Sequence, residues 1–378
     1  MSDQEGDNTG AEMDPVECAV EKWVHHDDSG NITPVMEDYH RYILRKWIFI
    51  AVCIVAAFLA AGYSLKVGAY DIGYVDTYKT IWEHLTGNIR PGNDDYVIWD
   101  MKLPRTITAI LAGAGLAAAG VVMQSILRNP LADPYTTGIS SGASFGATLA
   151  LGLGITFGSA GYAVITNAFL FALIPMGVIV TVSKMRGATP STMIMAGIAI
   201  MYIFNALTTM IKLFVDPDKL AAIFEWSVGT LEGTNWNNVG IMFVVVAVGV
   251  VALQLLAKKL NVISAGDDSA RAIGVDAEKL RLVSLMIVSL LAAGVVSFTG
   301  LIGFVGLVCP HIARLIIGSD TRYLMPASMA FGAALLLFAD GIGRYVISPS
   351  TIQVGVITAI IGAPLFLYLI VRSKKEAA

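Results

Sequence analysis

The chain has 378 residues, of which 56% are hydrophobic and only 14% are charged, and its mean hydropathy is +0.69. Soluble domains carry about a quarter charged residues, so this composition excludes an ordinary soluble protein and indicates a membrane protein. The three cysteines, Cys18, Cys53 and Cys309, lie far apart and give neither a disulfide framework nor a CxxC metal motif.

The first 40 residues are strongly acidic. They hold eleven Asp or Glu residues and one Lys, a net charge of −10, whereas the rest of the chain carries a net +6. A segment with so few apolar residues cannot offset its ordering entropy, so we expect 1–40 to be a disordered extension and 41–378 to be the membrane domain. The extension lacks the basic and apolar regions of a signal peptide. It is either a solvated extension or an interaction tail.

About ten membrane spans follow, because a bilayer-spanning helix needs about 20 mostly apolar residues. We place them at roughly 47–65, 104–127, 138–157, 161–182, 190–214, 238–257, 282–300, 303–318, 324–345 and 353–371. Glycines recur every fourth residue at Gly138, Gly142 and Gly146, which lets a neighbouring backbone approach closely. The expected fold is therefore an all-α integral membrane protein with a compact bundle.

The basic residues predict the orientation of the spans. With the N-terminus in the cytoplasm, 17 of the 25 Lys and Arg residues fall on the cytoplasmic side, as the positive-inside rule favours. An even number of spans then places both termini in the cytoplasm, with the protein in the cell membrane.

A short segment that occurs twice, with nearly the same sequence, indicates an internal repeat. "LAAAGVV" (116–122) in the second span returns as "LLAAGVV" (290–296) in the seventh, and these two spans run in opposite directions. This is typical of an inverted repeat of a transporter, here of spans 2–5 and 7–10.

Two motifs typical of hydrolases are absent from the sequence. It contains no HExxH and no G-x-x-x-x-G-K-S/T phosphate loop, and we expect a protein that is not an enzyme and has no cofactor. In "GLVCPHIARLIIG" (306–318), Cys309 and His311 are two apart and point about 200° away from each other on a helix. With no further ligand nearby, we interpret this stretch as a helix end kinked at Pro310, without a metal site.

Polar residues inside or beside the spans are the candidate functional residues. Asp340 and Arg344 are four apart and can pair within a helix. The stretch 264–281 contains helix-start residues and a glycine stop, which predicts a short cytoplasmic helix near 266–275; it is either a connecting loop helix or a docking element. Side chains that either line a path or bind neighbouring helices are Gln124, Asn167, Asn205, Thr208 and Thr209.

Several segments together resemble one family. They are "KLPRT" (102–106), "AGAGLAAAGVVMQSILRNPLADP" (112–134), "ARAIGV" (270–275), "GLIGFVGLVCPHIARLIIGSDTR" (300–322), "LFADGIGR" (337–344) and "VGVITAIIGAPLFLYLI" (354–370). They are similar to the FecCD family, the permease subunits of ATP-binding-cassette importers for iron-siderophores, haem and cobalamin. The resemblance covers 45–375, with one departure: Thr351 to Gln353 replace the acid and the proline usual in the family.

The resemblance implies a ten-span subunit in a homodimer, or in a heterodimer with a related permease, within the lipid bilayer. Two copies of a separate ATPase would dock inside and a solute-binding protein outside; nucleic acid is not an expected partner. Coupling to the ATPase would fall to Asp267, Asp268, Ala270, Arg271, Ala272 and Gly274. Docking of the binding protein would fall to Lys102, Arg105 and Arg344.

Other functions remain as alternatives. An oxyanion importer would use the same scaffold. An ion-coupled secondary transporter needs intramembrane carboxylates, for which Asp340 is the candidate. A membrane enzyme or receptor would need a nucleophile, a base or a signalling domain that the sequence does not offer.

Overall fold

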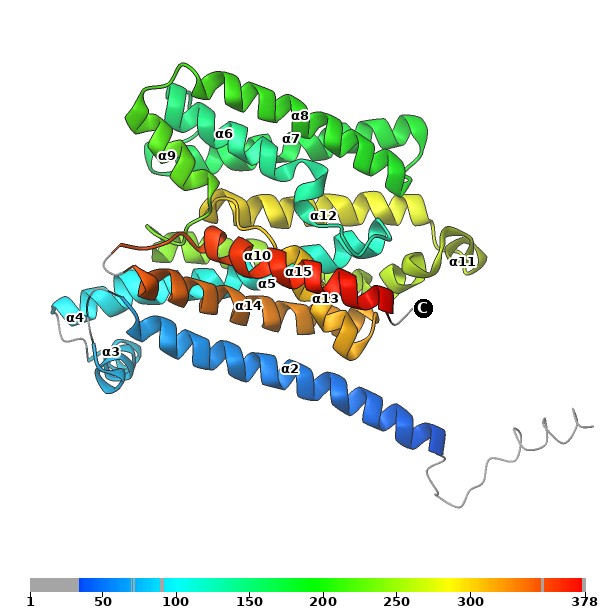
Figure 1. Cartoon of the computed structure of the whole chain (residues 1–378), viewed down its shortest axis with the longest axis horizontal. Helices are drawn as coiled ribbons and strands as arrows, with labels where there is room; N and C mark the ends of the chain where they lie inside the picture. The colour runs from blue at the N-terminus through cyan, green and yellow to red at the C-terminus, as the bar shows by residue number, and fades with distance from the viewer. Residues whose placement is uncertain (1–33, 69, 71, 89–91, 348–349, 376–378) are drawn as a thin grey trace, which may run out of the picture. The chain divides into compact units, whose positions relative to one another are not determined.

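The computed structural model describes residues 34–68, 70, 72–88, 92–347 and 350–375, and these are helical with connecting loops and no β-strand (Figure 1). The chain divides into two units, Met1–Arg45 and Lys46–Ala378. Residues 1–33 of the predicted acidic extension lie outside the described part, so its disorder stays a prediction. The arrangement described below is that of the second unit.

Ten apolar helices follow the ten predicted spans in order. Within the described residues, seven are long and apolar enough to cross a membrane, and three are shorter apolar helices. The seven are α2 (Pro34–Lys66), α5 (Leu103–Ile126), α7 (Ala163–Arg186), α8 (Pro190–Lys212), α10 (Trp236–Ala265), α12 (Ala277–Thr299) and α14 (Thr321–Val346). The three are α6 (Ile139–Leu153), α13 (Val305–Ile317) and the part Val354–Tyr368 of α15 (Val354–Lys375). The predicted all-α membrane fold is confirmed.

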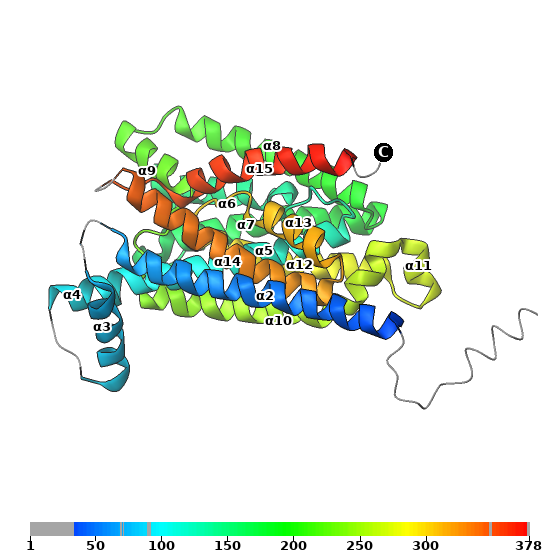
Figure 2. The same ribbon diagram turned by 60° about the horizontal axis from the view of Figure 1, so that its bottom comes forward.

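Short elements connect these helices. They are α3 (Tyr74–Thr86), α4 (Asn93–Asp95), the π-helix η1 (Tyr96–Lys102), the 3-10 helices η2 (Pro134–Thr137) and η3 (Ala160–Tyr162), α9 (Pro217–Ser227) and α11 (Asp267–Ala272). Figures 1 and 2 show α3 and α4 at one end of the long helices and α11 at the other, so we call these the α3 end and the α11 end.

Side-chain caps fix where several helices begin. Thr189 accepts a hydrogen bond from the Thr192 N–H before α8, and Asp276 accepts one from the Lys279 N–H before α12, at 3.2 and 3.0 Å. Such caps satisfy N–H groups that have no partner within the helix. The polar residue before each apolar run thus marks its start.

The helices pack as two corresponding sets. In each set the second helix packs on the third and fourth: α6 on α7 and α8, and α13 on α14 and α15. The first helix of each set packs on the third of the other, α5 on α14 and α12 on α7. Figure 1 shows α5 beginning at the α3 end and α12 beginning at the α11 end. This reciprocal packing of antiparallel helices supports the predicted inverted repeat.

Glycines bring α5 into backbone contact with its neighbours. A Cβ atom added to Gly120 would lie 1.8 Å from the carbonyl oxygen of Gly306 on α13, and one added to Gly113 would lie 2.4 Å from that of Gly332 on α14. Apolar helices gain little from burying surface that lipid would also cover, so close backbone packing is a main source of their association. These contacts hold α5 in the centre of the unit.

We predict that Gly120→Ala destabilises the protein. The blocking atom belongs to the backbone and cannot rotate away, and overpacking of this kind costs about 1–3 kcal/mol. The melting temperature of the detergent-solubilised protein should fall. The matched control is Gly177→Ala on α7, where an added Cβ meets no described atom within 4 Å. Equal melting temperatures for the two variants would contradict the prediction.

Candidate functional site

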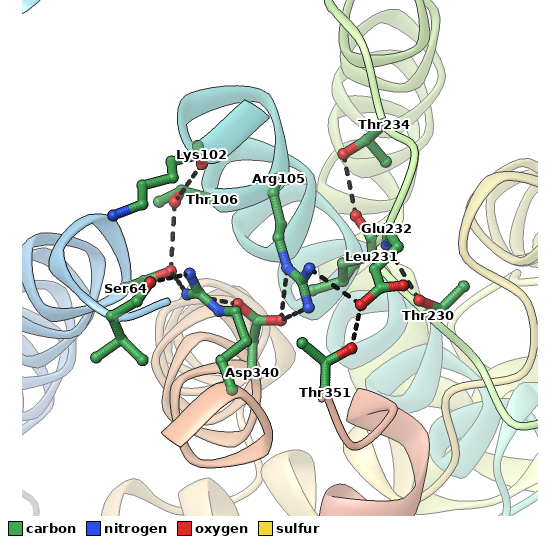
Figure 3. Close-up of polar contacts among 12 residues, drawn as sticks. Ser64, Lys102, Arg105, Thr106, Thr230, Leu231, Glu232, Thr234, Asp340 and Thr351 are labelled. Carbon is green, nitrogen blue, oxygen red and sulfur yellow. Dashed lines mark hydrogen bonds and ion pairs between the residues drawn. The ribbon is translucent and has the colours of Figure 1, made fainter. Parts of the chain in front are cut away.

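A buried carboxylate at the α3 end holds two arginines. Asp340 on α14 is 1% exposed and accepts hydrogen bonds from Nε and Nη2 of Arg105 on α5, at 2.9 and 2.8 Å (Figure 3). Its other oxygen lies 2.8 Å from Nη2 of Arg344, one turn along the same helix. The predicted pair of Asp340 and Arg344 is therefore present, and Arg105 is a second arginine bound to the same carboxylate.

Two of the basic side chains also bind the end of α2. Arg344 donates to the carbonyl oxygen of Val67 at 2.7 Å and to the hydroxyl of Ser64. Lys102 donates from Nζ to the carbonyl oxygen of Lys66 at 3.1 Å. The last carbonyl groups of a helix lack intrahelical partners and carry partial negative charge, which suits a cation.

The structure brings Lys102, Arg105 and Arg344 together, but it does not expose them equally. Lys102 and Arg344 are 7% and 6% exposed, and their donors serve the protein itself. The three residues expected to dock the binding protein are therefore not equally available: in this conformation Lys102 and Arg344 are buried and bind other parts of the chain. The Arg105 side chain is 15% exposed.

An unpredicted acid lies beside Arg105. Glu232, in the loop between α9 and α10, is half-exposed, and its Oε1 is 3.5 Å from Nη1 of Arg105 (Figure 3). The same oxygen accepts a hydrogen bond from Thr351, one of the residues at the departure from the family pattern. These three residues border a cleft of about 660 Å³ that Lys102 and Arg344 also line. Nothing in the sequence distinguishes Glu232 from other loop acids.

At the α11 end, the predicted coupling residues face in different directions. Ala270 is fully buried against Ile263 and Leu280, so its small side chain serves internal packing. Ala270, expected among the coupling residues, is therefore not available on the surface of α11. Asp267, whose side chain is 31% exposed, contacts Arg128 and Arg281.

The rest of α11 is accessible. The side chains of Asp268 and Arg271 are exposed, with an ion-pair distance of 3.9 Å between them. Ala272 is also exposed, and Gly274 follows with a φ of +77°, a left-handed conformation that glycine adopts without strain. The accessible part of the predicted set is thus Asp268, Arg271, Ala272 and Gly274.

The candidate path residues separate into two groups. Asn167 is fully buried; its amide donates to the Ile155 carbonyl at 2.7 Å and accepts from the Phe157 N–H at 2.8 Å. Gln124 is buried and donates to the Leu307 carbonyl at 3.2 Å. Both bind neighbouring backbone, which was the open alternative to lining a path.

The other three candidates lie on α8. Thr208 is 6% exposed, whereas Asn205 and Thr209 are exposed, and the Thr209 hydroxyl donates to the Asn205 carbonyl at 2.8 Å. In this conformation Asn205 and Thr209 are the accessible members of the predicted set. His311 lies on α13 and packs edge-on against Phe366 of α15, with 6.0 Å between ring centroids.

Comparisons with known proteins agree with this architecture. Residues 49–372 match the FecCD transport family. The ABC transporter permease protein MJ0087 of Methanocaldococcus jannaschii is 41% identical over 90% of this chain and 99% of its own. The iron(3+)-hydroxamate import permease FhuB of Bacillus subtilis is 35% identical over 84% and 81%. The cobalamin import permease BtuC of Halobacterium salinarum is 37% identical over 74% of each chain.

A solved structure gives the same result. The inward-facing structure of a metal-chelate type ABC transporter superposes with a TM-score of 0.75 at 30% identity, covering 85% of this chain and 98% of that one. A match over most of the chain, in sequence and in fold, defines a multi-pass membrane permease. The chain belongs to the FecCD transport family.

We predict that Asp340→Asn destabilises the protein strongly. It leaves Arg344 buried without its counter-charge and Arg105 with only the half-exposed Glu232, and breaking a buried pair in this way costs about 3–5 kcal/mol. The melting temperature in detergent should fall well below that of the unmodified protein. Glu232→Gln is the matched control, because a half-exposed ion pair contributes only about 0–1 kcal/mol. A smaller loss for Asp340→Asn than for Glu232→Gln would contradict the assignment.

Proposed function

We propose that the chain is the permease subunit of an ATP-binding-cassette importer that carries an iron-siderophore, haem or cobalamin. The observation that carries this proposal is the family match along residues 49–372, with relatives named for iron-hydroxamate and cobalamin import. A dimer of this subunit, or of this subunit and a related permease, encloses the path. ATP is hydrolysed on a separate chain.

The α11 end faces the cytoplasm and the α3 end faces outward in this proposal, with both termini inside. The greater number of basic residues on the α11 side supports this orientation. Two ATPase subunits bind at α11, where exposed Asp268 and Arg271 offer both signs of charge. A concave surface of about 470 Å³ beside α11 would give the ATPase a place to dock; Arg271, Asp276 and Glu278 line it, and the partly exposed Asp267 lies at it as well.

The solute-binding protein docks at the α3 end, over the cleft beside Arg105. Acidic groups of that partner would compete with Glu232 for the Arg105 guanidinium, whereas buried Lys102 and Arg344 contribute to the local positive potential. Guanidinium groups bind carboxylates through paired hydrogen bonds, which makes Arg105 the best-placed contact.

The dimer is supported by polar residues on an apolar face of α8. Asn205 and Thr209 are exposed there among apolar side chains such as Tyr202 and Met210. Polar side chains in membrane helices face protein or a water-filled cavity far more often than lipid. A second subunit across this face would place them at an aqueous path between the two copies.

An ion-coupled transporter is less well supported. Its candidate coupling carboxylate was Asp340, which is bound by two arginines. A proton or a metal cation would have to displace these partners to bind there.

Uptake by the reconstituted importer tests the function. The permease is placed in liposomes with the ATPase and binding protein of its own organism, and entry of a ferric hydroxamate, haem, cobalamin and molybdate is measured with and without ATP. We expect ATP-dependent entry of one of the first three. Entry of molybdate alone would support the oxyanion importer, and uptake that needs an ion gradient instead of the ATPase would support a secondary transporter.

We predict that Arg105→Glu weakens the complex with the binding protein, since it places like charges in contact. The unmodified complex should weaken as salt rises, because exposed charges are screened within about 8 Å at physiological ionic strength. Glu232→Gln leaves the buried pair intact and should strengthen the complex. Affinities are measured by surface plasmon resonance on folded, monodisperse protein. Unchanged affinity in both variants at low and high salt would rule out this docking site.

A further inference from the structure

The inner face of α11 is joined to the bundle through one carboxylate. The helix spans Asp267–Ala272, which is too short to be stable alone, so its position depends on its contacts. Ala270 provides the apolar contact. Asp267, the first residue of the helix, provides the polar one.

Two arginines hold Asp267. Arg281, which is 0% exposed, donates from Nη1 to Oδ2 at 3.1 Å and from Nη2 to Oδ1. Nη2 of Arg128 also contacts Oδ1. The carboxylate thus receives a two-point contact from one guanidinium and a further contact from the other. Paired charge-assisted bonds of this kind fix direction as well as distance.

Arg281 binds two further segments of the bundle. Its Nε donates to the carbonyl oxygen of Ile126, the last residue of α5, at 3.0 Å. Its Nη1 also donates to the carbonyl oxygen of Ala188, in the connection between α7 and α8, at 3.3 Å. Through Arg281, which belongs to the first turns of α12, Asp267 is linked to three other elements.

Arg128 adds a fourth element. Its Nε donates to the carbonyl oxygen of Ile263 near the end of α10, at 3.1 Å. Its φ is +47°, a left-handed conformation that is strained for a residue other than glycine. Burial lowers the pKa of Arg128 from its ordinary value, and the charge of Arg281 lowers it further. The hydrogen bond to Ile263 and the contact with Asp267 hold Arg128 in place despite its strained backbone and the partial burial of its charge.

We propose that Asp267, Arg128 and Arg281 form a clasp that transmits movement of α11 into the bundle, and that Asp267 is a positioning residue, not an ATPase contact. This rests on the proposed docking of the ATPase at α11. The exposed side chains of Asp268 and Arg271 receive the partner. The clasp carries the resulting displacement to the ends of α5 and α10, to the start of α12 and to the α7–α8 connection.

The test compares a clasp variant with a docking variant in the full reconstituted importer. Asp267→Asn removes the charge in the clasp, and Arg271→Glu reverses a charge on the exposed face. Three quantities are measured: ATPase bound to the permease, ATP hydrolysed, and substrate imported per ATP.

For Asp267→Asn we expect ATPase binding close to that of the unmodified protein. Import per ATP should fall about tenfold or more, because the variant loses the charge-assisted hydrogen bonds that join α11 to the bundle. For Arg271→Glu we expect the reverse: weaker ATPase binding, with unchanged import per ATP in the complexes that remain.

A second variant separates transmission from folding. Asp267→Asn alone leaves Arg281 buried without its counter-charge, which can destabilise the protein. In the double variant Asp267→Asn with Arg281→Met, the fully buried charge of Arg281 is gone and the partly exposed Arg128 remains in contact with water, so the melting temperature should recover relative to Asp267→Asn. Import per ATP should stay low, because the link is still missing.

Three outcomes would overturn the proposal. If Asp267→Asn loses ATPase binding as Arg271→Glu does, Asp267 is a docking contact. If import per ATP is normal in a folded clasp variant, or recovers in the double variant, the clasp does not transmit movement of α11 to the bundle. If both single variants bind the ATPase and import normally, α11 is not the docking element, and that part of the proposed function fails as well. Should ATP drive no import by the unmodified protein, the importer assignment itself is wrong.

Discussion

The central position of α5 depends on close backbone contact with α13 and α14. Gly113 and Gly120 allow this contact, since a side chain at either position would meet a carbonyl oxygen of the neighbouring helix. Leu103–Ile126 spans roughly 36 Å at 1.5 Å per residue, enough to cross the hydrocarbon core of a bilayer. Both charge clusters lie at the ends of this one helix: Arg105 near its start, and Arg128 just beyond its last residue.

The two charge clusters lie at opposite ends of α5 and use the same chemistry. In each, one carboxylate accepts hydrogen bonds from one guanidinium group and forms an ion pair with a second. Arg344 in the first cluster, and Arg128 and Arg281 in the second, also donate to carbonyl oxygens at or near helix ends. A buried charge is tolerated only when its partners replace the lost water, and backbone carbonyls at helix ends are free to do so. The two clusters differ in what lies next to them. Glu232 and a cleft adjoin the first, and the exposed face of α11 adjoins the second.

The sequence predicts features that depend on local periodicity and misses those that depend on distant contacts. Hydropathy locates the ten apolar helices, and a four-residue spacing predicts the pairing of Asp340 and Arg344. The third member, Arg105, is 235 residues away from Asp340, and nothing local indicates it. Glu232 is missed for the same reason, since its partners come from α5 and from the segment before α15.

The direction of individual side chains on short elements was also beyond the sequence. One turn of helix is too short for a hydrophobic period, so the inward position of Asp267 and Ala270 in α11 emerges only from the packing of α10, α11 and α12. Likewise, the sequence alone does not distinguish an asparagine that lines a path from one, such as Asn167, whose buried amide binds the backbone of a loop. Its partners, the backbone groups of Ile155 and Phe157, are set by where that loop folds back.

The backbone packing of α5 limits how the bundle can respond to a force at α11. A contact made by flexible side chains can absorb a small displacement through rotamer changes, whereas a contact between two backbones cannot. If the proposed clasp operates, movement delivered through Arg281 to the Ile126 carbonyl would displace α5 as a rigid body. Because α14 touches α5 at Gly113 and Gly332, it would be displaced together with α5. Asp340 on α14 and Arg105 on α5 would then move as one pair, so that the cleft at the α3 end changes mainly against the loop of Glu232 and the segment of Thr351.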